Sequence, residues 1–380
     1  MRRRLFRVLL AIIGLFGLVL LAIRLVYGGG SPYIDLAAAP VLESAAVERL
    51  GSLGFPAGNV TASPDGRIFV NIHPFVQAER FTDAYLFELV DGQPVPYPNQ
   101  PAQAHLRHVF GMNVDGQGRL WAISPATLDR DRTRIQAFDL ATGTRIVDHT
   151  FAEGVARFSQ DLRVTPDGKA IILADTGAFQ FTEASLVVVD LETMAARSIL
   201  KGHPSTQPQD WMIRTGEGNH TIGWGLITFS VGVDGIAISP DGQFLYYATM
   251  SHDTLYRLPL PAVLDPSLAA DKLAAQIEVV GEKPLSDGIE TTADGEVLLT
   301  DIEHGAIVGI RPDGKRRTLV RLGHDTISWT DGVAVGPNGE VYFTDSEIPS
   351  YLDPLLRPPT REVLSKRAPH VAVYQFKLPH

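Results

Sequence analysis

The sequence predicts an all-β protein, a six-bladed β-propeller preceded by one N-terminal transmembrane or signal helix. Three observations support this prediction: a motif that recurs six times, a glycine turn inside each copy, and one apolar run behind a cluster of arginines. Apart from one long and one short interval, the copies are spaced by about 50 residues, which is typical of a propeller whose blades are four-stranded sheets around a central channel.

The first 30 residues are expected to form a signal anchor or a signal peptide. Arginines at positions 2 to 4 precede the apolar run Leu5–Tyr27, which is interrupted only by Arg7 and Arg24. A basic start followed by an apolar stretch fits both kinds of segment. The absence of an A-x-A cleavage pattern directly after the run favours an uncleaved anchor. The arginines place the rest of the chain outside the cytoplasm, on the periplasmic side in a bacterium.

Each repeat supplies the two inner strands of one blade, which we call A and B, joined by an Asp-Gly or Asn-Gly type turn. Such turns need residues that tolerate positive φ. The turn glycines are Gly66, Gly118, Gly168, Gly242, Gly295 and Gly339. Strand A is expected to begin near Asn59, Gly111, Gln160, Asp234, Asp287 and Asp331.

The sixth repeat ends before an outer strand can follow, so the missing strand must come from elsewhere. Residues 40–54, ahead of the first blade, are expected to supply it and so to remove the open sheet edge. The predicted organisation is therefore residues 1–30 as signal segment, 31–57 as linker and closing strand, and 58–380 as propeller.

Most of the unusual polar residues are predicted at one end of the propeller. Each blade has four strands, A to D, counted outward from the channel. The loops that lead from strand D of one blade to strand A of the next, and from B to C within a blade, lie at the end where each strand A begins. We call this end the mouth. The longest insertion, Gly202–Gly232, is one of these loops, and insertions of this length are usually functional. The side chains expected to bind a ligand at the mouth are Trp211, Trp224, His252 and Asp331.

Composition narrows the possible partners. The formal net charge of −10 argues against a nucleic-acid surface. There are no cysteines, which excludes disulfides, thiol catalysis and cysteine-based zinc sites. The expected partners are a small-molecule ligand and the inner membrane, through the N-terminal helix. The oligomeric state stays open.

Two segments carry a family resemblance: DGIAISPDGQFLYYATMSHDTLYRL from Asp234 and SDGIETTADGEVLLTDIEHGAI from Ser286. Together with the block that starts at Val187, they resemble the major royal jelly protein/yellow family, over roughly Gly58–Leu378. The resemblance implies a six-bladed propeller, secretion and small-molecule binding at the mouth. Insect members are associated with pigment pathways and biogenic-amine binding. They usually carry cysteines, which this chain lacks.

A wider resemblance is to the senescence-marker/gluconolactonase family of metal-dependent lactonases, which hold one divalent cation with a Glu, two Asn and an Asp. Matched motif by motif, this chain has Asn59, Gln160, Asp234 and Asp287 at those positions, and only Asp287 keeps the family residue. Two amides and two carboxylates are oxygen ligands that suit Ca²⁺. In the lactonase interpretation, Asp161 would activate water and His304 would assist.

Each candidate also has a structural interpretation. A single Asp at a strand start commonly accepts backbone N–H bonds and orders its own loop, and a lone histidine on a loop is commonly just exposed. Several carboxylates in one narrow channel are different, because they repel each other unless a cation or protons intervene. Three hypotheses follow: a ligand-binding propeller of royal jelly/yellow type, a metal-dependent lactonase or ester hydrolase, and a protein-interaction platform.

Overall fold

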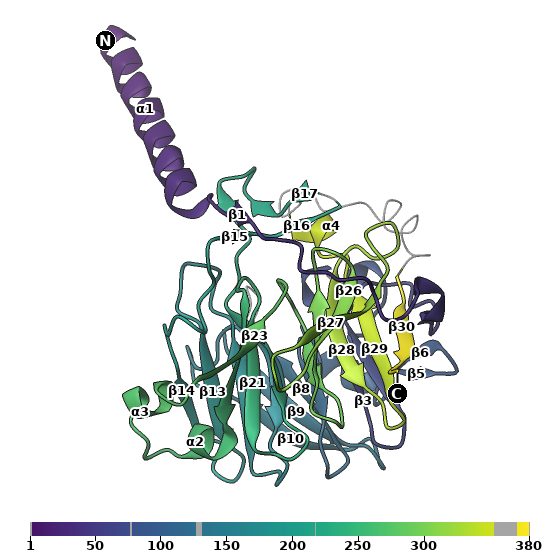
Figure 1. Cartoon of the computed structure of the whole chain (residues 1–380). Coiled ribbons are helices and arrows are strands. Elements are labelled where there is room, and N and C mark those ends of the chain that lie inside the picture. The colour runs from purple at the N-terminus through teal and green to yellow at the C-terminus, as the bar shows by residue number, and fades with distance from the viewer. Residues whose placement is uncertain (1, 77, 127–130, 217, 353–370, 380) are drawn as a thin grey trace.

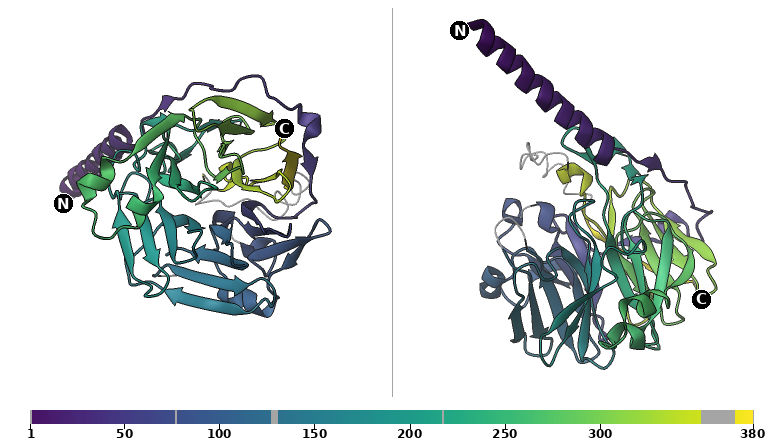
Figure 2. Two further views of the ribbon diagram at one scale, coloured as in Figure 1. Left: turned by 60° about the horizontal axis from the view of Figure 1, so that its bottom comes forward. Right: turned by 90° about the vertical axis from the view of Figure 1, so that its left-hand side faces the viewer.

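Six four-stranded antiparallel sheets form a ring in the computed structural model, which describes residues 2–76, 78–126, 131–216, 218–352 and 371–379. Figure 1 shows the ring from the side, with helix α1 (Arg2–Tyr27) extending from one end. Figure 2 (left) looks obliquely across the ring. The predicted fold class, an all-β six-bladed propeller with one N-terminal helix, is confirmed.

The strands follow the chain blade by blade. Blade one contains β3 (Ala57–Ala62), β4 (Ile68–Ile72), β5 (Leu86–Val90) and β6 (Gln93–Pro96). Blade two contains β7 (Met112–Val114), β8 (Arg119–Ser124), β9 (Arg134–Asp139) and β10 (Arg145–Thr150). Blade three contains β11 (Ser159–Val164), β12 (Ala170–Asp175), β13 (Ser185–Asp190) and β14 (Ala196–Ile199).

Blade four contains β20 (Val233–Ile238), β21 (Phe244–Thr249), β22 (Thr254–Pro259) and β23 (Glu278–Glu282). Blade five contains β24 (Ile289–Thr291), β25 (Val297–Asp301), β26 (Ala306–Ile310) and β27 (Arg316–Arg321). Blade six contains β28 (Thr330–Val335), β29 (Glu340–Asp345), β30 (Val373–Lys377) and β2 (Glu48–Arg49). The short helices are α2 (Leu260–Leu264), α3 (Ala270–Ala274), α4 (Pro349–Leu352), and the 3₁₀ turns Ser44–Ala46, Pro74–Val76, Ala78–Arg80 and Pro101–His105.

The inner hairpins form where the repeat predicts them. All six turn glycines have positive φ, between 68° and 87°, which only glycine adopts without strain. The second strand of each blade is buried along nearly its whole length, as in β12 and β29, because neighbouring blades cover both of its faces. The outer strand β10 instead alternates between exposed and half-buried residues.

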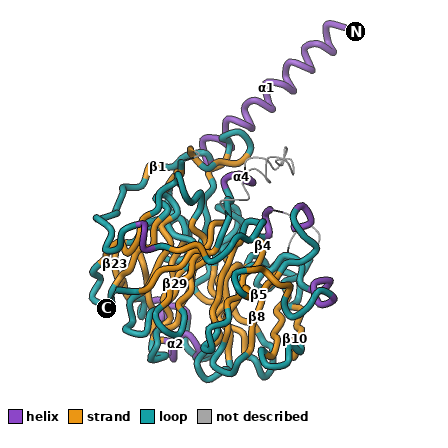
Figure 3. The backbone as a smooth tube through the Cα atoms, turned by 90° about the vertical axis from the view of Figure 1, so that its right-hand side faces the viewer, coloured by secondary structure: helices purple, strands orange, loops and turns teal. Residues whose placement is uncertain are grey.

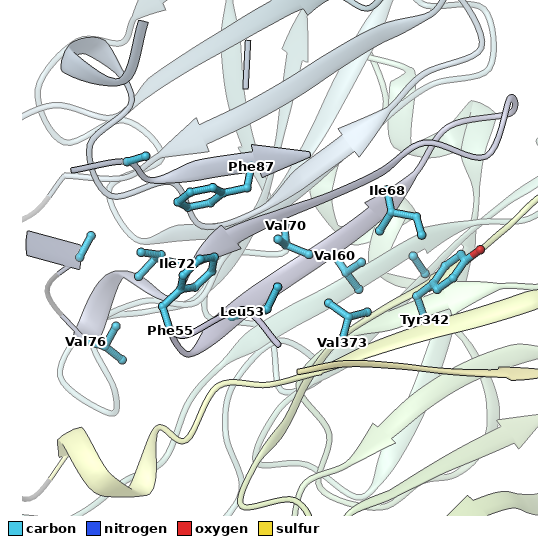
Figure 4. Packing of buried hydrophobic residues seen from close by; sticks show 14 of the residues in the cluster. Leu53, Phe55, Val60, Ile68, Val70, Ile72, Val76, Phe87, Tyr342 and Val373 are labelled. Atoms are coloured by element: carbon cyan, nitrogen blue, oxygen red, sulfur yellow. The ribbon is translucent and has the colours of Figure 1, made fainter. Parts of the chain in front are cut away.

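Apolar side chains fill the space between neighbouring blades. Between blades six and one, Val60 and Val70 of the inner strands share one cluster with Tyr342 and Val373. Figure 4 shows these residues pointing toward one another, with Leu53 also in the cluster. The blades are therefore joined by packing, together with hydrogen bonds between neighbouring inner strands, such as the one from the Gly288 N–H to the Asp331 carbonyl oxygen at 3.0 Å.

Blade six is closed by a strand from the other end of the chain. Strand β2 pairs antiparallel with β30, with Glu48 opposite Gln375 and Arg49 opposite Tyr374. The outer strand expected within residues 40–54 is therefore present. It covers the edge of β30 that would otherwise remain open.

Residues 31–47, which we call the strap, follow the rim of the propeller from α1 to β2. Strand β1 (Ser31–Pro32) pairs in parallel with β15 (Trp211–Met212). Farther along, the Val41 and Leu42 N–H groups donate to carbonyl oxygens of β27 at 2.9 Å. The segment is bound along the blades rather than a free linker.

The long insertion between blades three and four is folded. Besides β15, it contains the hairpins β16 (Arg214–Thr215) with β17 (Gly218–Asn219), and β18 (Thr221–Ile222) with β19 (Ile227–Thr228). Figure 1 shows β15, β16 and β17 above the ring, near α1 and α4, while α2 and α3 lie at the opposite end.

Candidate functional site

Four aspartates from the starts of inner strands gather at the channel: Asp161, Asp234, Asp287 and Asp331, which we call the aspartate ring. Asp161, Asp234 and Asp331 are buried, and Asp287 is half-buried. They come from blades three to six, so the propeller brings together residues up to 170 positions apart.

The glycine after each of three ring members explains how the inner strands approach so closely. A Cβ on Gly235 would lie 2.7 Å from the Asp287 carbonyl oxygen, and one on Gly288 would lie 2.7 Å from the Asp331 carbonyl oxygen. Both distances are shorter than a side-chain carbon tolerates. Each Asp-Gly pair therefore combines a carboxylate at the channel with the absence of a side chain facing the next blade.

The ring members raise one another's pKa. Burial raises the pKa of Asp234 well above its ordinary value, and the charges of Asp287, Asp161 and Asp331 add to the effect. Burial raises the pKa of Asp331 in the same way, followed by the charge of Asp287. Burial also raises the pKa of Asp287 to about 7, although the Trp329 hydrogen bond opposes it. The ring carboxyls therefore bind protons more tightly than ordinary aspartates unless a cation compensates their charge.

Two carboxylate oxygens of the ring are buried without a hydrogen-bond donor. They are Asp234 Oδ2 and Asp331 Oδ2, although the Ser346 hydroxyl lies near enough to Asp331 to lower its pKa. Buried polar atoms are nearly always hydrogen-bonded, so two orphaned oxygens in one channel point to a missing partner. A cation or a donor group supplied by a ligand would satisfy both.

Asp161 differs from the other three because a guanidinium already compensates it. Arg163 Nη1 lies 2.8 Å from Asp161 Oδ1, and Arg163 Nη2 lies 3.5 Å from Glu290 Oε2 and 2.9 Å from the Ile289 carbonyl oxygen. The other oxygen, Asp161 Oδ2, accepts from the Ile236 N–H at 3.3 Å. To activate a water molecule as a general base, Asp161 would first have to break its interactions with Arg163 and the Ile236 N–H. Sequence reasoning missed Arg163, although a charged residue within a buried inner strand was the available signal.

Aromatic side chains lie beside two members of the ring, Asp287 and Asp331. Trp329 Nε1 donates to Asp287 Oδ2 at 2.8 Å, and the indole packs edge-on against His220 at 5.5 Å. His73 Nε2 lies 3.8 Å from Asp331 Oδ2, and the His73 ring packs against Phe110. Burial lowers the pKa of His73 to about 3, so this imidazole is neutral and does not neutralise Asp331.

The predicted ligand-binding tryptophans lie in the insertion, and neither has a described contact with the ring. Trp211 is half-buried and packs edge-on against Tyr33 at 4.8 Å. Trp224 is 82% exposed at the tip of the β18–β19 hairpin. The tryptophan that contacts the ring is Trp329, to which sequence reasoning assigned no role.

The two predicted histidines belong to separate clusters. His304 Nδ1 lies 2.9 Å from Asp301 Oδ1, and its Nε2 lies 3.5 Å from Asp35 of the strap. Burial opposes the charged form, but these carboxylates raise the pKa of His304. His252 is buried, and burial together with the charge of Lys283 lowers its pKa to about 4. A catalytic role for His304 and a ligand-binding role for His252 remain predictions.

A buried lysine lies next to the ring in sequence, and sequence reasoning did not single it out. Lys283 Nζ donates to Ser286 Oγ and to the Pro284 carbonyl oxygen, both at 3.0 Å. Burial lowers the pKa of Lys283 to about 7. Its amine is turned into the D-to-A loop, where it holds Ser286 immediately before Asp287.

The negative charge of the predicted metal ligands suits a cation, but their observed contacts do not form a metal site. Across the described ranges, no three acidic or histidine side chains form a group that could hold a metal ion. Gln160 Nε2 donates to Thr176 Oγ1 at 3.3 Å, and the Asn59 N–H donates to Asn71 Oδ1 at 2.6 Å. The orphaned Asp234 oxygen fits a cation, whereas Asp287 already accepts from Trp329. A Ca²⁺ site at Asn59, Gln160, Asp234 and Asp287 remains a prediction.

Comparisons with known proteins agree on the architecture. The sequence model of the major royal jelly protein family matches residues 108–352. A solved gluconolactonase from Xanthomonas campestris is 13% identical, with a TM-score of 0.53, over 88% of this chain and 89% of its own. The calcium-binding protein regucalcin from Agrobacterium tumefaciens is 17% identical, with a TM-score of 0.52, over 89% and 95%. At these identities the likeness shows the fold alone. No curated protein sequence matches the chain.

Proposed function

This chain belongs to the major royal jelly protein family, and we propose that it is a membrane-tethered, extracytoplasmic propeller that binds a small organic cation at the aspartate ring. The observation that carries the proposal is the pair of orphaned, buried oxygens, Asp234 Oδ2 and Asp331 Oδ2. An ammonium group supplies donors to such oxygens and neutralises the carboxylates that now raise one another's pKa.

The surroundings of the ring favour an organic cation over a bare metal ion. Trp329, which packs against His220, donates to Asp287, and His73, which packs against Phe110, lies beside Asp331. Aromatic side chains accommodate the apolar body of an amine, and the faces of their rings attract its charge. No third acidic or histidine side chain of the described part joins two ring members into a metal-binding group.

Tethering is supported by the N-terminal helix. The helix Arg3–Tyr27 is long and apolar enough to cross a membrane, and the cluster of arginines at the N-terminus favours an N-terminus in the cytoplasm. The propeller would then lie on the outer side, on the periplasmic face of the inner membrane in a bacterium.

Binding of a cation should release protons. Burial and repulsion within the ring raise the pKa values of Asp234, Asp287 and Asp331, that of Asp287 to about 7, and a bound ammonium favours the ionised forms. Over the pH range in which binding releases one proton, the affinity rises about tenfold for each pH unit. Affinity should therefore increase from pH 6 to pH 8.

The test is calorimetric titration of the full chain in detergent with tyramine, an aromatic primary amine, and with 4-ethylphenol, its neutral analogue. We expect tyramine to bind, 4-ethylphenol not to bind, and proton release to appear as a buffer-dependent enthalpy. The double variant Asp234→Asn/Asp287→Asn should lose tyramine binding while unfolding as cooperatively as the wild type. Equal binding by the double variant, or no difference between the two compounds, would refute the proposal.

The same titration decides between an amine and a divalent cation. If Ca²⁺ binds to the wild type, is lost in the double variant and excludes tyramine, the metal interpretation replaces ours. A metal-dependent lactonase would in addition hydrolyse a simple lactone only when Ca²⁺ or another divalent ion is present. If neither a small molecule nor a metal ion binds at the ring, the remaining hypothesis is that the propeller is a protein-interaction platform.

A further inference from the structure

Helix α1 joins the propeller at the same end as the aspartate ring. Its last residue is Tyr27, and strand β1 begins at Ser31, after three glycines. In Figures 1 and 3, α1 leaves the molecule beside β1 and α4, at the end opposite α2. The strand starts that carry the ring also lie at this mouth end.

The connection between α1 and the propeller has almost no slack. Four residue steps from Tyr27 to Ser31 span at most about 14 Å even when fully extended. The Tyr27 ring packs against Phe181 with centroids 4.9 Å apart, and the Ser31 N–H donates to the Asp210 carbonyl oxygen at 3.0 Å. Thr228 Oγ1 donates to the Gly29 carbonyl oxygen. If α1 crosses a membrane, the insertion must lie close to the membrane surface.

The hairpin beside the end of α1 presents a tryptophan to the outside. Strand β19 contacts α1, and Trp224 at the tip of the β18–β19 hairpin is 82% exposed. Its φ is 56°, between two glycines that also have positive φ. Such a backbone is unfavourable for a bulky residue and calls for a reason. Tryptophan is enriched at membrane–water interfaces, where an apolar ring with one polar edge is stabilised.

Other exposed aromatic residues share this face. Outside α1, the exposed phenylalanine and tryptophan side chains among the described residues are Phe75, Phe181 and Trp224, all on mouth loops. The opposite end carries exposed charges instead, such as Asp271 and Lys272 in α3. The remaining exposed apolar side chains of the blades are aliphatic, on the outer two strands: Val90, Val95, Ile146 and Val279.

We propose that the propeller is held with its mouth against the membrane that α1 crosses, with Trp224 in the headgroup layer. The aspartate ring then opens toward the membrane surface, and a ligand reaches it along that surface rather than from bulk solution. This inference rests on the proposed function in one respect, which is that α1 remains attached as an anchor.

The first test uses the fluorescence of the full chain reconstituted in phosphatidylcholine vesicles that carry a nitroxide quencher at the headgroup. Trp121 and Trp329 are buried and Trp211 is half-buried, so Trp224 is the indole most accessible to a quencher. We expect clear quenching in the wild type, loss of at least half of it in Trp224→Phe, and retention in the matched variant Trp211→Phe. Equal quenching in the wild type and Trp224→Phe would overturn the proposal.

A second measurement uses the absence of cysteines, which allows one label to be placed at will. A polarity-sensitive fluorophore on Phe181→Cys should shift to shorter wavelength on transfer from detergent to vesicles, whereas one on Ser267→Cys at the opposite end should not. Equal shifts at the two positions contradict the orientation, and so does release of the protein from vesicles by cleavage after α1.

The two proposals fail separately. Tyramine binding is measured in detergent, where no bilayer is present. Retained tyramine binding with a water-exposed Trp224 in vesicles overturns the membrane orientation alone. Headgroup quenching of Trp224 without tyramine binding supports the orientation and refutes the ligand proposal alone.

Discussion

Replacing Asp287 with asparagine should make the propeller more stable at alkaline pH. Burial raises the pKa of Asp287 from 3.8 to about 7 in the folded state. For an acid with a raised folded pKa, the stabilisation is fully present below the unfolded pKa, near 4. It is lost as the pH rises through the folded pKa, near 7. At pH 8, the wild type must therefore hold an unfavourable buried charge that Asp287→Asn removes.

The magnitude follows from the shift. A change of about three pKa units corresponds to at most about 4 kcal/mol, at about 1.4 kcal/mol per unit. The water that reaches the half-buried Asp287 reduces this, so we expect a gain of about 1–4 kcal/mol at pH 8 and almost none at pH 4. The asparagine side-chain oxygen can still accept the Trp329 Nε1 hydrogen bond, which limits other losses.

The assay is urea unfolding followed by tryptophan fluorescence at pH 4 and pH 8. The matched control is Asp345→Asn, because the buried Asp345 carboxylate accepts the N–H groups of Ser328, Trp329 and Glu347 at 2.9–3.0 Å. This control should lose about 1–3 kcal/mol at pH 8. If Asp287→Asn is destabilised at pH 8 as the control is, then Asp287 chiefly orders its loop and the functional interpretation of the ring is wrong.

Two further predictions concern the interior and the closure. Arg163→Met should lower stability by about 3–5 kcal/mol at pH 7 in the same urea assay, because it leaves the Asp161 charge buried and unpaired; an unchanged midpoint would contradict the pair's importance. Removal of residues 2–30 should leave a propeller with nearly wild-type thermal unfolding, whereas removal of residues 2–50 also deletes the strap and β2 and should abolish cooperative unfolding. Similar melting curves for both truncations would show that the closing strand is dispensable.

The blade architecture was predictable because its determinants are local. An Asp-Gly or Asn-Gly turn between two alternating apolar strands specifies a hairpin within about 15 residues, and six copies of it leave few arrangements other than a propeller. The positive φ of all six turn glycines, from Gly66 to Gly339, agrees with that reasoning. The closing strand was predictable for a related reason, since an unpaired edge in blade six had to be covered.

The chemistry of the site was only partly predictable. Asp-Gly pairs at strand starts pointed to Asp234, Asp287 and Asp331, because the repeat places equivalent positions side by side around the axis. The partner of each carboxylate did not follow from the repeat. Arg163 contacts the Ile289 carbonyl oxygen across 126 positions, and Trp329 reaches Asp287 across 42.

Contacts between distant segments depend on how neighbouring blades pack, and no local propensity encodes them. The strap and the insertion are the clearest cases, because Ser31–Pro32 pairs with Trp211–Met212 only once both lie on the mouth. Turn chemistry and strand alternation in the chain thus specify six blades and where each begins. The tertiary structure alone decides which carboxylates are compensated, which tryptophan reaches the ring, and that helix α1 emerges beside the mouth, because burial and charge pairing arise only when the blades close.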